Sequence, residues 1–519
     1  MVTVGIGPLT GEDVTAVARH GSQVLISDDA VEAMRHSRAV IESLAEDPLP
    51  HYGVSTGFGA LAVKQIPTDQ RRQLQRSLVR SHAASSGSPV EREVVRGLML
   101  NRLSTMATGR TGVRPAVARA YADLLNAEIA PVIGEYGSLG CSGDLAPLSH
   151  CALAVMGEGE VFDAEGARRP AAEVLAEAGI APMELQEKEG LALINGTDGM
   201  LGMLLMAAAD LQRLLRTADV AAAMTLEALL GTDAVFAADL QALRPQPGQA
   251  DSASNIRSLL ADSDLIAETK HGEQEHRRTR VQDAYSLRCA PQVHGAARST
   301  LAHAEAVAGY ELASAIDNPV VTLDGRIESN GNFHGAPVGY VLDFLAIAVA
   351  DCASMSERRT DRLLDTARNH GLNAFLAHDP GVDSGHMIAQ YTQAGIVSEL
   401  KRLAVPASVD SIPSSAMQED HVSMGWAAGL KLRRAVDGIT RVLAVEILTA
   451  ARALDMRDGG VDTSRAAPGI TAVRRAVRSR VEGPGTDRFL APEIEATTEL
   501  VRDGEVITAA ESALASPLR

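Results

Sequence analysis

The residues of this chain best suited to chemistry lie in one short segment, residues 137–150, which reads GSLGCSGDLAPLSH. Glycines surround Cys141 and Ser142, and an Asp and an apolar run follow. Glycine allows tight turns and close backbone approach, so this pattern predicts a loop that leads into a helix. A helix start offers free N–H groups and the positive end of the helix dipole. The segment is therefore a candidate site for an anion or an electrophile.

Three other interpretations of this loop are open at this point. A phosphate-binding loop would end in Gly-Lys-Ser/Thr or show dinucleotide-binding spacing, and the segment has neither. A hydrolase nucleophile at Ser142 or Cys141 would need the pattern G-x-S-x-G, whose second glycine is missing. A purely structural turn is the third interpretation, and it needs no chemistry at all.

Six distant segments share a family pattern with this loop. They are HYGVSTGFGAL (51–61), SH (81–82), LINGTDG (193–199), VQDAYSLRCAPQ (281–292), NGNFHGAP (330–337) and SAMQEDHVSM (415–424). With the loop, they make nearly the whole chain resemble the histidine and phenylalanine ammonia-lyase family. The resemblance implies a mainly α fold of fumarase/aspartase-like architecture and the elimination of ammonia from an amino acid.

In that family the central loop residues form a cofactor, 4-methylidene-imidazol-5-one (MIO), and the resemblance assigns this role to Cys141, Ser142 and Gly143. The nitrogen of Gly143 attacks the carbonyl carbon of residue 141, and dehydration of Ser142 leaves an exocyclic methylene. Only glycine permits that backbone approach, and among the three only serine supplies the lost hydroxyl. The resemblance implies an autocatalytic reaction and no external cofactor.

Cys141 stands where the family most often has alanine. Because residue 141 contributes its carbonyl to the ring while its side chain points outside, a small thiol is compatible with cyclisation. A loop at a helix start can lower the pKa of a thiol. We therefore expect Cys141 to affect the maturation rate and the resistance to oxidation.

The resemblance gives proton-transfer and carboxylate roles to Tyr52, Tyr285 and Glu419. Tyr52 is the expected general base for the β-proton, which requires a pKa below the usual value of about 10 for a phenol. Tyr285 is expected to assist proton transfer near the cofactor. Glu419 matches a position that carries a carboxylate in the histidine enzymes.

The resemblance also assigns substrate binding to His82, Asn195, Gln282, Arg288 and Phe333. Arg288 is expected to clamp the substrate carboxylate, and its spacing of three from Tyr285 places both on one face of a helical turn. Considered singly, these residues have ordinary explanations. His82 follows Leu74 and Leu78 on an apolar helix face, Asn195 could cap a helix, and Phe333 could pack in the core.

Two features favour histidine as the substrate, with trans-urocanate as the product and histidine degradation as the context. The pair Ser81-His82 and the carboxylate of Glu419 both resemble the histidine-specific enzymes. The alternatives are a phenylalanine or tyrosine ammonia-lyase, an aminomutase of the same family and, more remotely, a Ser/Cys hydrolase.

Composition limits the other classes of function. The 519 residues are 46% hydrophobic and only 3% aromatic, which favours packed helices over sheets. A net charge of -18 argues against nucleic acid as a partner. Four cysteines show no metal-ligand spacing, and the N-terminus lacks the pattern of a secretory signal. The longest apolar run noted, residues 199–209, is too short to span a membrane. These features predict a soluble cytoplasmic protein without a bound metal.

Helical patterning predicts a long-helix bundle core behind a mixed N-terminal domain. We expect residues 1–194 to carry the Cys141 and Tyr52 loops and residues 195–519 to form the long-helix region. Long helices are expected over residues 201–230, 293–315, 338–367 and 424–454, and shorter ones over 31–44 and, with an N-cap at Ser88, up to Gly109. Residues 270–280 are charged and predict an exposed loop. The family resemblance implies a homotetramer whose sites take residues from more than one subunit.

Overall fold

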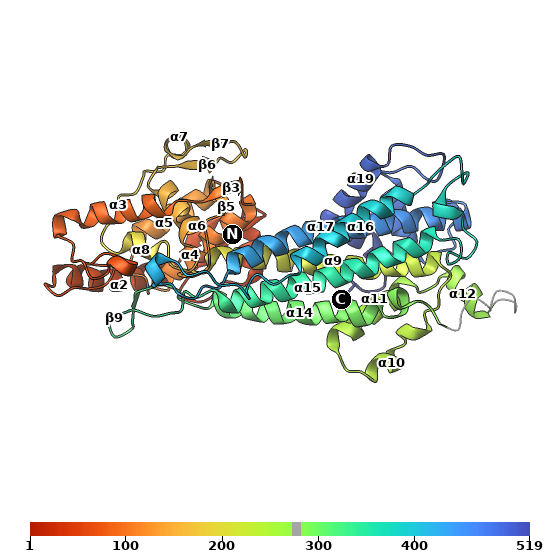
Figure 1. The fold of residues 1–519 in the computed structure, drawn as a ribbon, viewed down its shortest axis with the longest axis horizontal. Helices are drawn as coiled ribbons and strands as arrows, with labels where there is room; N and C mark the ends of the chain where they lie inside the picture. Colours follow the sequence, from red (N-terminus) through yellow and green to blue (C-terminus); the bar gives the residue numbers. More distant parts are fainter. Residues whose placement is uncertain (272–281) are drawn as a thin grey trace. The chain divides into compact units, whose positions relative to one another are not determined.

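The computed structural model describes residues 1–271 and 282–519, so most of the predicted charged loop at 270–280 lies outside the described residues. The chain divides into two compact units, both mainly helical (Figure 1). The first unit comprises Met1–Ala208, Ala304–Asp343 and Pro406–Leu430, and the second comprises Ala209–His303, Phe344–Val405 and Lys431–Arg519. The first unit therefore extends the expected N-terminal region, residues 1–194, and adds two later segments of the chain.

The first unit contains eight complete helices and four small sheets within its described residues. The helices are α1 (Gly11–Ala18), α2 (Asp28–Glu46), α3 (Arg71–His82), α4 (Arg92–Ala107), α5 (Pro115–Asn126), α6 (Leu145–Val155), α7 (Ala171–Glu177) and α8 (Glu189–Ala192), with short 3₁₀ turns η1 (Gly59–Leu61), η2 (Thr68–Gln70) and η5 (Ser415–Met417). The strands are β1 (Val2–Val4), β2 (Val24–Ile26), β3 (Ser86–Pro89), β4 (Ala130–Pro131), β5 (Gly134–Tyr136), β6 (Glu160–Phe162), β7 (Arg168–Pro170), β8 (Val320–Val321) and β9 (Ile327–Glu328). They pair as β1-β2, β3-β5, β4-β6-β7 and β8-β9, and only β1-β2 is parallel.

Helix α4 forms the centre of the first unit. All its residues from Val94 to Ala107 are buried, including Arg96 and Arg102. A helix buried on every side belongs to a core, and its polar groups then need partners. Arg96 donates to the backbone carbonyls of Val17, at 2.7 Å, and Leu125, at 3.1 Å. The helix therefore holds neighbouring segments through its arginines as well as through apolar packing.

The predicted start of this helix was wrong, although its end at Gly109 was right. Ser88 and Pro89 belong to strand β3, which pairs with β5, and the helix begins at Arg92 without a side-chain cap. Pairing with a distant strand decided this segment, and no local capping pattern could reveal that partner. At the other end Gly109 has a φ of 68°, the left-handed conformation that commonly ends a helix.

The second unit is built from long helices with shorter ones around them. The helices wholly within it are α10 (Ala238–Ala242), α11 (Pro247–Leu259), α12 (Asp264–His271), α13 (Tyr285–Arg288), α16 (Met387–Leu403), α18 (Pro468–Arg478), α19 (Ala491–Arg502) and α20 (Glu505–Glu511), with η3 (Ala234–Phe236), η4 (Ala374–Leu376) and η6 (Val461–Thr463). Four long helices have residues in both units, namely α9 (Asp198–Ala228), α14 (Ala290–Leu312), α15 (Ala336–Leu364) and α17 (Gly425–Asp458). These four confirm the long helices predicted from the sequence.

Within the second unit, α9, α14, α15, α16 and α17 lie side by side (Figure 1). Leucines and other apolar side chains from four of them line one nearly filled gap, namely Leu211, Leu215, Ala297, Leu301, Leu345, Ala348, Val349 and Ile439. Burial of such side chains supplies most of the stabilising free energy of a helix bundle. The predicted long-helix bundle is therefore confirmed.

Buried ion pairs join the helices of this bundle at defined points. Arg359 on α15 donates from Nη2 to Oε2 of Glu446 on α17 over 2.8 Å, and the Thr225 hydroxyl on α9 donates to Oε1 over 2.8 Å. None of these three side chains is exposed to solvent. Because a buried charge without partners is costly, these bonds favour one register among the three helices.

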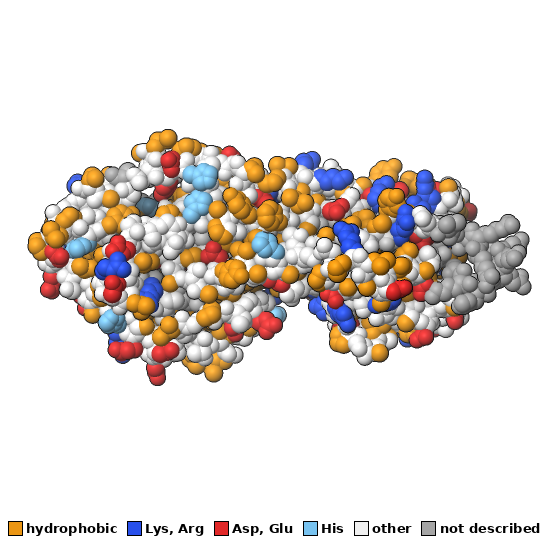
Figure 2. Space-filling view, turned by 90° about the horizontal axis from the view of Figure 1, so that it is seen from below, with side chains coloured by type: hydrophobic (Ala, Val, Ile, Leu, Met, Phe, Trp, Pro, Cys, Tyr) orange, Lys and Arg blue, Asp and Glu red, His pale blue; other side chains and the backbone are white. Residues whose placement is uncertain are grey.

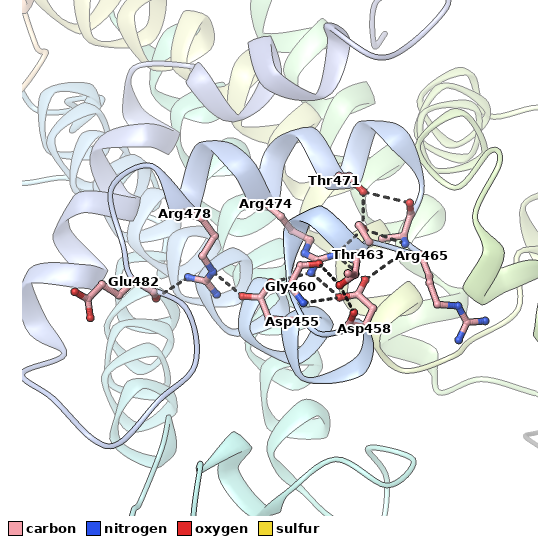
Figure 3. A network of polar contacts seen from close by, with 11 residues as sticks. Asp455, Asp458, Gly460, Thr463, Arg465, Thr471, Arg474, Arg478 and Glu482 are labelled. Atoms are coloured by element: carbon pink, nitrogen blue, oxygen red, sulfur yellow. Dashed lines mark hydrogen bonds and ion pairs between the residues drawn. The ribbon is translucent and has the colours of Figure 1, made fainter.

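A second polar network lies where α17 meets α18 (Figure 3). Arg474 on α18 donates to Oδ1 of Asp455 at 2.7 Å and to Oδ1 of Asp458 at 2.8 Å. Arg478, one turn later, donates to Oδ2 of Asp455 at 2.6 Å. The two arginines therefore fasten α18 to the last turns of α17.

Helix α15 is long and apolar enough to cross a membrane by length and composition, with a mean hydropathy of 1.6 in its most apolar stretch. The uninterrupted apolar run at residues 199–209 is shorter than this helix, and Asp343 divides the apolar stretch of α15. Of that stretch, 61% is buried inside the protein, as in a core helix. Its place in the bundle accounts for its apolar composition.

A buried carboxyl group makes the stability of the second unit dependent on pH. Burial raises the pKa of Glu227 on α9 from 4.5 to about 7, although the N–H of Ala467 donates to it at 2.8 Å. The folded state then binds this proton more tightly than the unfolded state. The free energy of unfolding should therefore fall as pH rises from about 4.5 to about 7, and then level off.

We expect Glu227→Gln to remove this contribution. Denaturant unfolding of both proteins at about pH 5 and about pH 8 measures it, and the loss of stability between the two conditions should be smaller in the variant. Equal losses in both proteins would show that Glu227 titrates alike in the folded and unfolded states.

Candidate active site

The glycine-rich loop runs from β5 to α6 and lies in the first unit. Gly140 and Gly143 have φ values of 67° and 77°, in the left-handed region that favours glycine. A Cβ atom on Gly143 would lie 2.0 Å from the carbonyl oxygen of Gly196, and one on Gly140 would lie 2.2 Å from Oγ of Ser423. Both positions therefore require glycine. The predicted loop before a helix is confirmed, since α6 begins at Leu145.

Asp144 connects this loop to the start of α9. Its Oδ2 accepts the backbone N–H groups of Gly199 and Met200, each at 2.9 Å, and its Oδ1 accepts the hydroxyl of Ser138 at 2.8 Å. The side chain is fully buried, and burial raises its pKa to about 7. A carboxylate at a helix N-terminus satisfies N–H groups that have no partner within the helix. Asp144 thus holds the loop in place from its C-terminal end.

Glu419 faces the two central side chains of the loop. Its Oε1 accepts the hydroxyl of Ser142 at 3.1 Å, and its Oε2 accepts the thiol of Cys141 at 3.2 Å. Ser414 also donates its hydroxyl to Oε2, at 2.9 Å. These contacts place a carboxylate directly against residues predicted to form the cofactor.

The thiol of Cys141 does not behave as expected for a loop at a helix start. Burial, and then the neighbouring carboxylate of Glu419, raise the pKa of Cys141 from 9.0 to about 12. Only 8% of the residue is exposed. The expected lowering of its pKa, with the sensitivity to oxidation that follows from it, was therefore wrong, because desolvation and a like charge disfavour the thiolate.

His82 ends helix α3 and lies within the electrostatic reach of Glu419. Its Nδ1 is 2.9 Å from the carbonyl oxygen of Leu78 and 3.0 Å from the hydroxyl of Ser81. Burial lowers the pKa of His82, while the Leu78 carbonyl and Glu419 act in the opposite direction. Since Leu78 requires a donor, the neutral ring carries its proton on Nδ1 and leaves Nε2 as an acceptor.

The loop that carries Tyr52 packs on two other parts of the site. The Tyr52 hydroxyl oxygen accepts the backbone N–H of Gly59 at 3.3 Å. A Cβ atom on Gly59 would lie 3.4 Å from Oγ of Ser415, and one on Gly53 would lie 2.7 Å from Leu191. The Tyr52 loop therefore lies between the Glu419 segment and helix α8.

Asn195 lies in the short connection between α8 and α9, and it is buried. Its side-chain amide donates to the carbonyl of Leu191 at 3.3 Å. Arg102 of α4 donates to the carbonyls of Asn195, at 2.7 Å, and Ile316, at 2.8 Å. A buried arginine thus holds the backbone that presents Asn195 and that contacts Gly143 through the neighbouring Gly196.

The segment with Phe333 reaches the loop through its neighbours. The N–H of Gly335 donates to the carbonyl of Gly140 at 3.4 Å. The imidazole of His334 stacks on that of His421, with ring centres 5.6 Å apart. Phe333 itself is half-buried. Sequence reasoning assigned no role to His334 or His421, and their stacking joins segments that are distant in the chain.

A polar cavity of about 540 Å³ opens beside His334 within the first unit. Its lining includes Glu311, Ser314 and Asn332. Burial raises the pKa of Glu311 to about 7, although Thr197 donates its hydroxyl to the carboxyl group at 3.3 Å. Glu311 is a second feature that sequence reasoning missed, because nothing in its local sequence indicates its burial.

The remaining predicted site residues lie in the second unit. Tyr285 and Arg288 form the short helix α13, and the guanidinium carbon of Arg288 lies 4.7 Å from the centre of the Tyr285 ring. The prediction that they share one face of a helical turn is confirmed. Gln282 is exposed, as is 70% of Tyr285. The first unit therefore brings together Tyr52, His82, Cys141, Ser142, Gly143, Asn195, Phe333 and Glu419, while Gln282, Tyr285 and Arg288 belong to the other unit.

The loop fits the predicted backbone cyclisation. Gly143 has no Cβ that could hinder its nitrogen, and Ser142 presents its hydroxyl to a carboxylate that can accept a proton. The bonds of Asp144, Gly143 and Gly140 with other segments hold both ends of the triad. Among the residues that the structure describes, no group of three or more His, Cys, Asp or Glu side chains is placed to hold a metal ion.

Comparison with known proteins identifies the family. Residues 9–479 match the family described as aromatic amino acid lyase. A histidine ammonia-lyase of Streptomyces avermitilis is 62% identical over 511 residues, 98% of each chain, and that of Streptomyces coelicolor is 62% identical over 519 residues, 100% of this chain and 99% of the relative.

Solved structures agree in fold. A tyrosine aminomutase from Streptomyces globisporus has a TM-score of 0.94 and 37% identity, with all of both chains covered. Histidine ammonia-lyase from Trypanosoma cruzi has a TM-score of 0.89 and 36% identity over 99% of this chain and 95% of that chain.

The four cysteines should differ in reactivity towards an alkylating reagent. Cys141, Cys151 and Cys352 are buried, whereas Cys289 is half-buried. Burial also raises the pKa of Cys141 and of Cys352 to about 12, so little thiolate is available at neutral pH. Timed labelling of the native protein with iodoacetamide, followed by peptide mass analysis, should modify Cys289 first. Faster labelling of Cys141 than of Cys289 would contradict the burial and raised pKa of the Cys141 thiol.

Proposed function

Because the chain belongs to the aromatic amino acid lyase family, we propose that it eliminates ammonia from L-histidine to give trans-urocanate, the first step of histidine degradation. The chain is a lyase. The relatives that share 62% identity with it are histidine ammonia-lyases, which supports this substrate.

One observation carries the proposal. Glu419 contacts Ser142 and Cys141 at 3.1 and 3.2 Å, and its charge acts to raise the pKa of His82. The carboxylate of Glu419 and Nε2 of His82 can accept hydrogen bonds from N–H groups of a substrate imidazole. A phenyl ring has no N–H group, so it would offer no hydrogen-bond partner to Oε1 of Glu419 or to Nε2 of His82. The polar side chains of Glu419 and His82 therefore favour histidine as the substrate.

Cys141, Ser142 and Gly143 are the residues that would form the MIO group, with Asp144 and the backbone of Gly196 holding them. When present, the group supplies an electrophilic methylene that converts the amino group of the substrate into a better leaving group. Asn195 would orient the amino group beside it. The glycine requirement at position 143 supports this role.

The chain's own residues then have separate tasks in the elimination. Tyr52 removes the β-proton of the substrate, and Glu419 and His82 hold its ring. Arg288 binds the carboxylate through two parallel hydrogen bonds, Gln282 contributes to substrate binding, and Tyr285 assists proton transfer near the cofactor. Phe333 shapes the pocket. In the proposed homotetramer, different subunits contribute to one site.

Exposed apolar side chains support self-association. Phe344 and Ile347, on the part of α15 in the second unit, are 46% and 47% exposed and line a cavity with Val293 and Ala296. One face of the molecule shows apolar side chains at the surface among charges of both signs (Figure 2). Such apolar surfaces are typical of protein interfaces. We propose a cytoplasmic homotetramer with a small amino acid as substrate and no nucleic-acid or membrane partner.

An aminomutase is the second candidate function. The TM-score of 0.94 with a tyrosine aminomutase favours it, because the two folds agree over their whole length. Both candidates begin by removing ammonia, and they differ in whether the ammonia returns to the neighbouring carbon. Product analysis by chromatography separates them, since a β-amino acid would appear only with the aminomutase.

We expect the mature protein to lack the mass of two water molecules, localised to the peptide that contains residues 141–143. In Ser142→Ala, the peptide should retain the mass of at least one of these water molecules, and the variant should release no ammonia. Its fold should stay intact, because the substitution removes only a hydroxyl. Intact-mass and peptide mass measurements test the first expectation, and circular dichroism of the variant tests the last. Full turnover by Ser142→Ala would exclude the MIO group.

Substrate choice should depend on His82. With the purified protein, urocanate formation from histidine should exceed deamination of phenylalanine or tyrosine, and His82→Leu should reverse this preference, because it removes a polar partner of the ring. The absorbance of each unsaturated acid provides the measurement. Failure of the wild-type protein to form urocanate would rule out histidine as the substrate.

A further inference from the structure

The two oxygens of the Glu419 carboxylate have different surroundings. Oε2 accepts two hydrogen bonds, from the thiol of Cys141 at 3.2 Å and from the hydroxyl of Ser414 at 2.9 Å. Oε1 accepts one, from the hydroxyl of Ser142 at 3.1 Å. That third donor is the group that dehydration of Ser142 would remove. The other two would remain.

Ser414 is well placed to act as a fixed donor. Its N–H donates to the carbonyl of Glu419 at 3.0 Å, and the N–H of Glu419 donates to the carbonyl of Ser414 at 3.3 Å. Between them Ser415, Ala416 and Met417 have φ values of 51°, 53° and 69°, a tight left-handed turn. Left-handed backbone is costly for residues other than glycine, so the two main-chain bonds help to hold the turn. The Ser414 hydroxyl is thereby kept beside Glu419.

We propose that Cys141 is a positioning residue for Glu419: its thiol and the Ser414 hydroxyl together hold Oε2, so that Oε1 points to the substrate once Ser142 has lost its hydroxyl. This inference rests on the proposed function, because it requires the MIO group to form. It gives the side chain at position 141 a task separate from the backbone carbonyl that enters the ring.

The chemistry of the thiol suits this task. Because the pKa of Cys141 is raised to about 12, the group stays protonated at neutral pH and acts as a donor to the carboxylate. A bond from a neutral donor to a carboxylate is stronger than one between neutral groups. Alanine at position 141 would remove the sulfur atom and leave Ser414 as the sole described side-chain donor to Oε2.

The main test compares Cys141→Ala with Cys141→Ser. We expect Cys141→Ala to lower kcat for histidine roughly threefold to tenfold, the worth of one hydrogen bond, with a smaller change in KM. Cys141→Ser supplies a hydroxyl donor and should restore most of kcat. Peptide mass spectra must show that each variant has lost two water molecules, so that kcat refers to mature protein.

A second arm removes the other donor. Ser414→Ala lies outside the cyclising triad, so it tests the anchoring of Oε2 even if a change at position 141 impairs maturation. It should also lower kcat, and the double variant Cys141→Ala/Ser414→Ala should lose more than the product of the single losses, because either donor alone still holds Oε2. Cys151→Ala is the matched control, since it removes a buried thiol from α6 without touching Glu419, and it should keep the wild-type kcat.

The outcomes separate this inference from the function on which it rests. Unchanged kcat in mature Cys141→Ala, failure of Cys141→Ser to recover activity, or strictly multiplicative losses in the double variant would each overturn the positioning role. If Cys141→Ala does not mature, unchanged kcat in Ser414→Ala overturns it. A wild-type protein that has lost no water, or that makes no urocanate, would instead overturn the proposed function.

Discussion

The site depends on the close approach of two backbone segments, Gly143 and Gly196, which pair in parallel with no space for a Cβ atom between them. The N–H of Asp144 donates to the carbonyl of Gly196 at 2.7 Å, and its carboxylate accepts the first N–H groups of α9. The loop is therefore held by the start of α9. A backbone that is confined in this way can bring a nitrogen and a carbonyl carbon together without help from another protein.

Holding the loop requires polar groups in the core, and burial has consequences for their charge. Arg102 binds the backbone around Asn195 and pairs with Asp198 at 3.2 Å, while Lys188 pairs with Asp317 nearby. Burial raises the pKa of Asp144 and of Asp198. The polar partners of each carboxylate stabilise its charged form, whereas loss of contact with water destabilises it. Such networks are costly unless they are complete, and they then favour one arrangement over others. The hydrogen bonds and ion pairs of this network therefore favour one arrangement of the backbone around the loop.

The other side chains around this loop come from separate segments of the chain. Glu419 comes from a left-handed turn, His82 from the last turn of α3, and Tyr52 from a loop that packs against the turn of Glu419. The chain is 62% identical to a histidine ammonia-lyase and shares its fold with a tyrosine aminomutase. In the proposed function the loop supplies the electrophile, and Glu419 and His82, which face it, select the amino acid.

Much of this molecule could be predicted from the sequence, because it depends on local patterns. Helical periodicity located α2 and the four long helices, and the glycines around Ser142 located the loop. Other features depend on contacts between distant residues. Ser88 joined a strand because β5 lies beside it, Cys141 acquired a raised pKa because Glu419 and burial disfavour the thiolate, and Ser414 and His334 gained neighbours from other segments. Residue types and spacing therefore determined which chemistry this chain can perform. Only the tertiary structure decided which side chains share the site and with what charge, since burial and electrostatic interaction act through space.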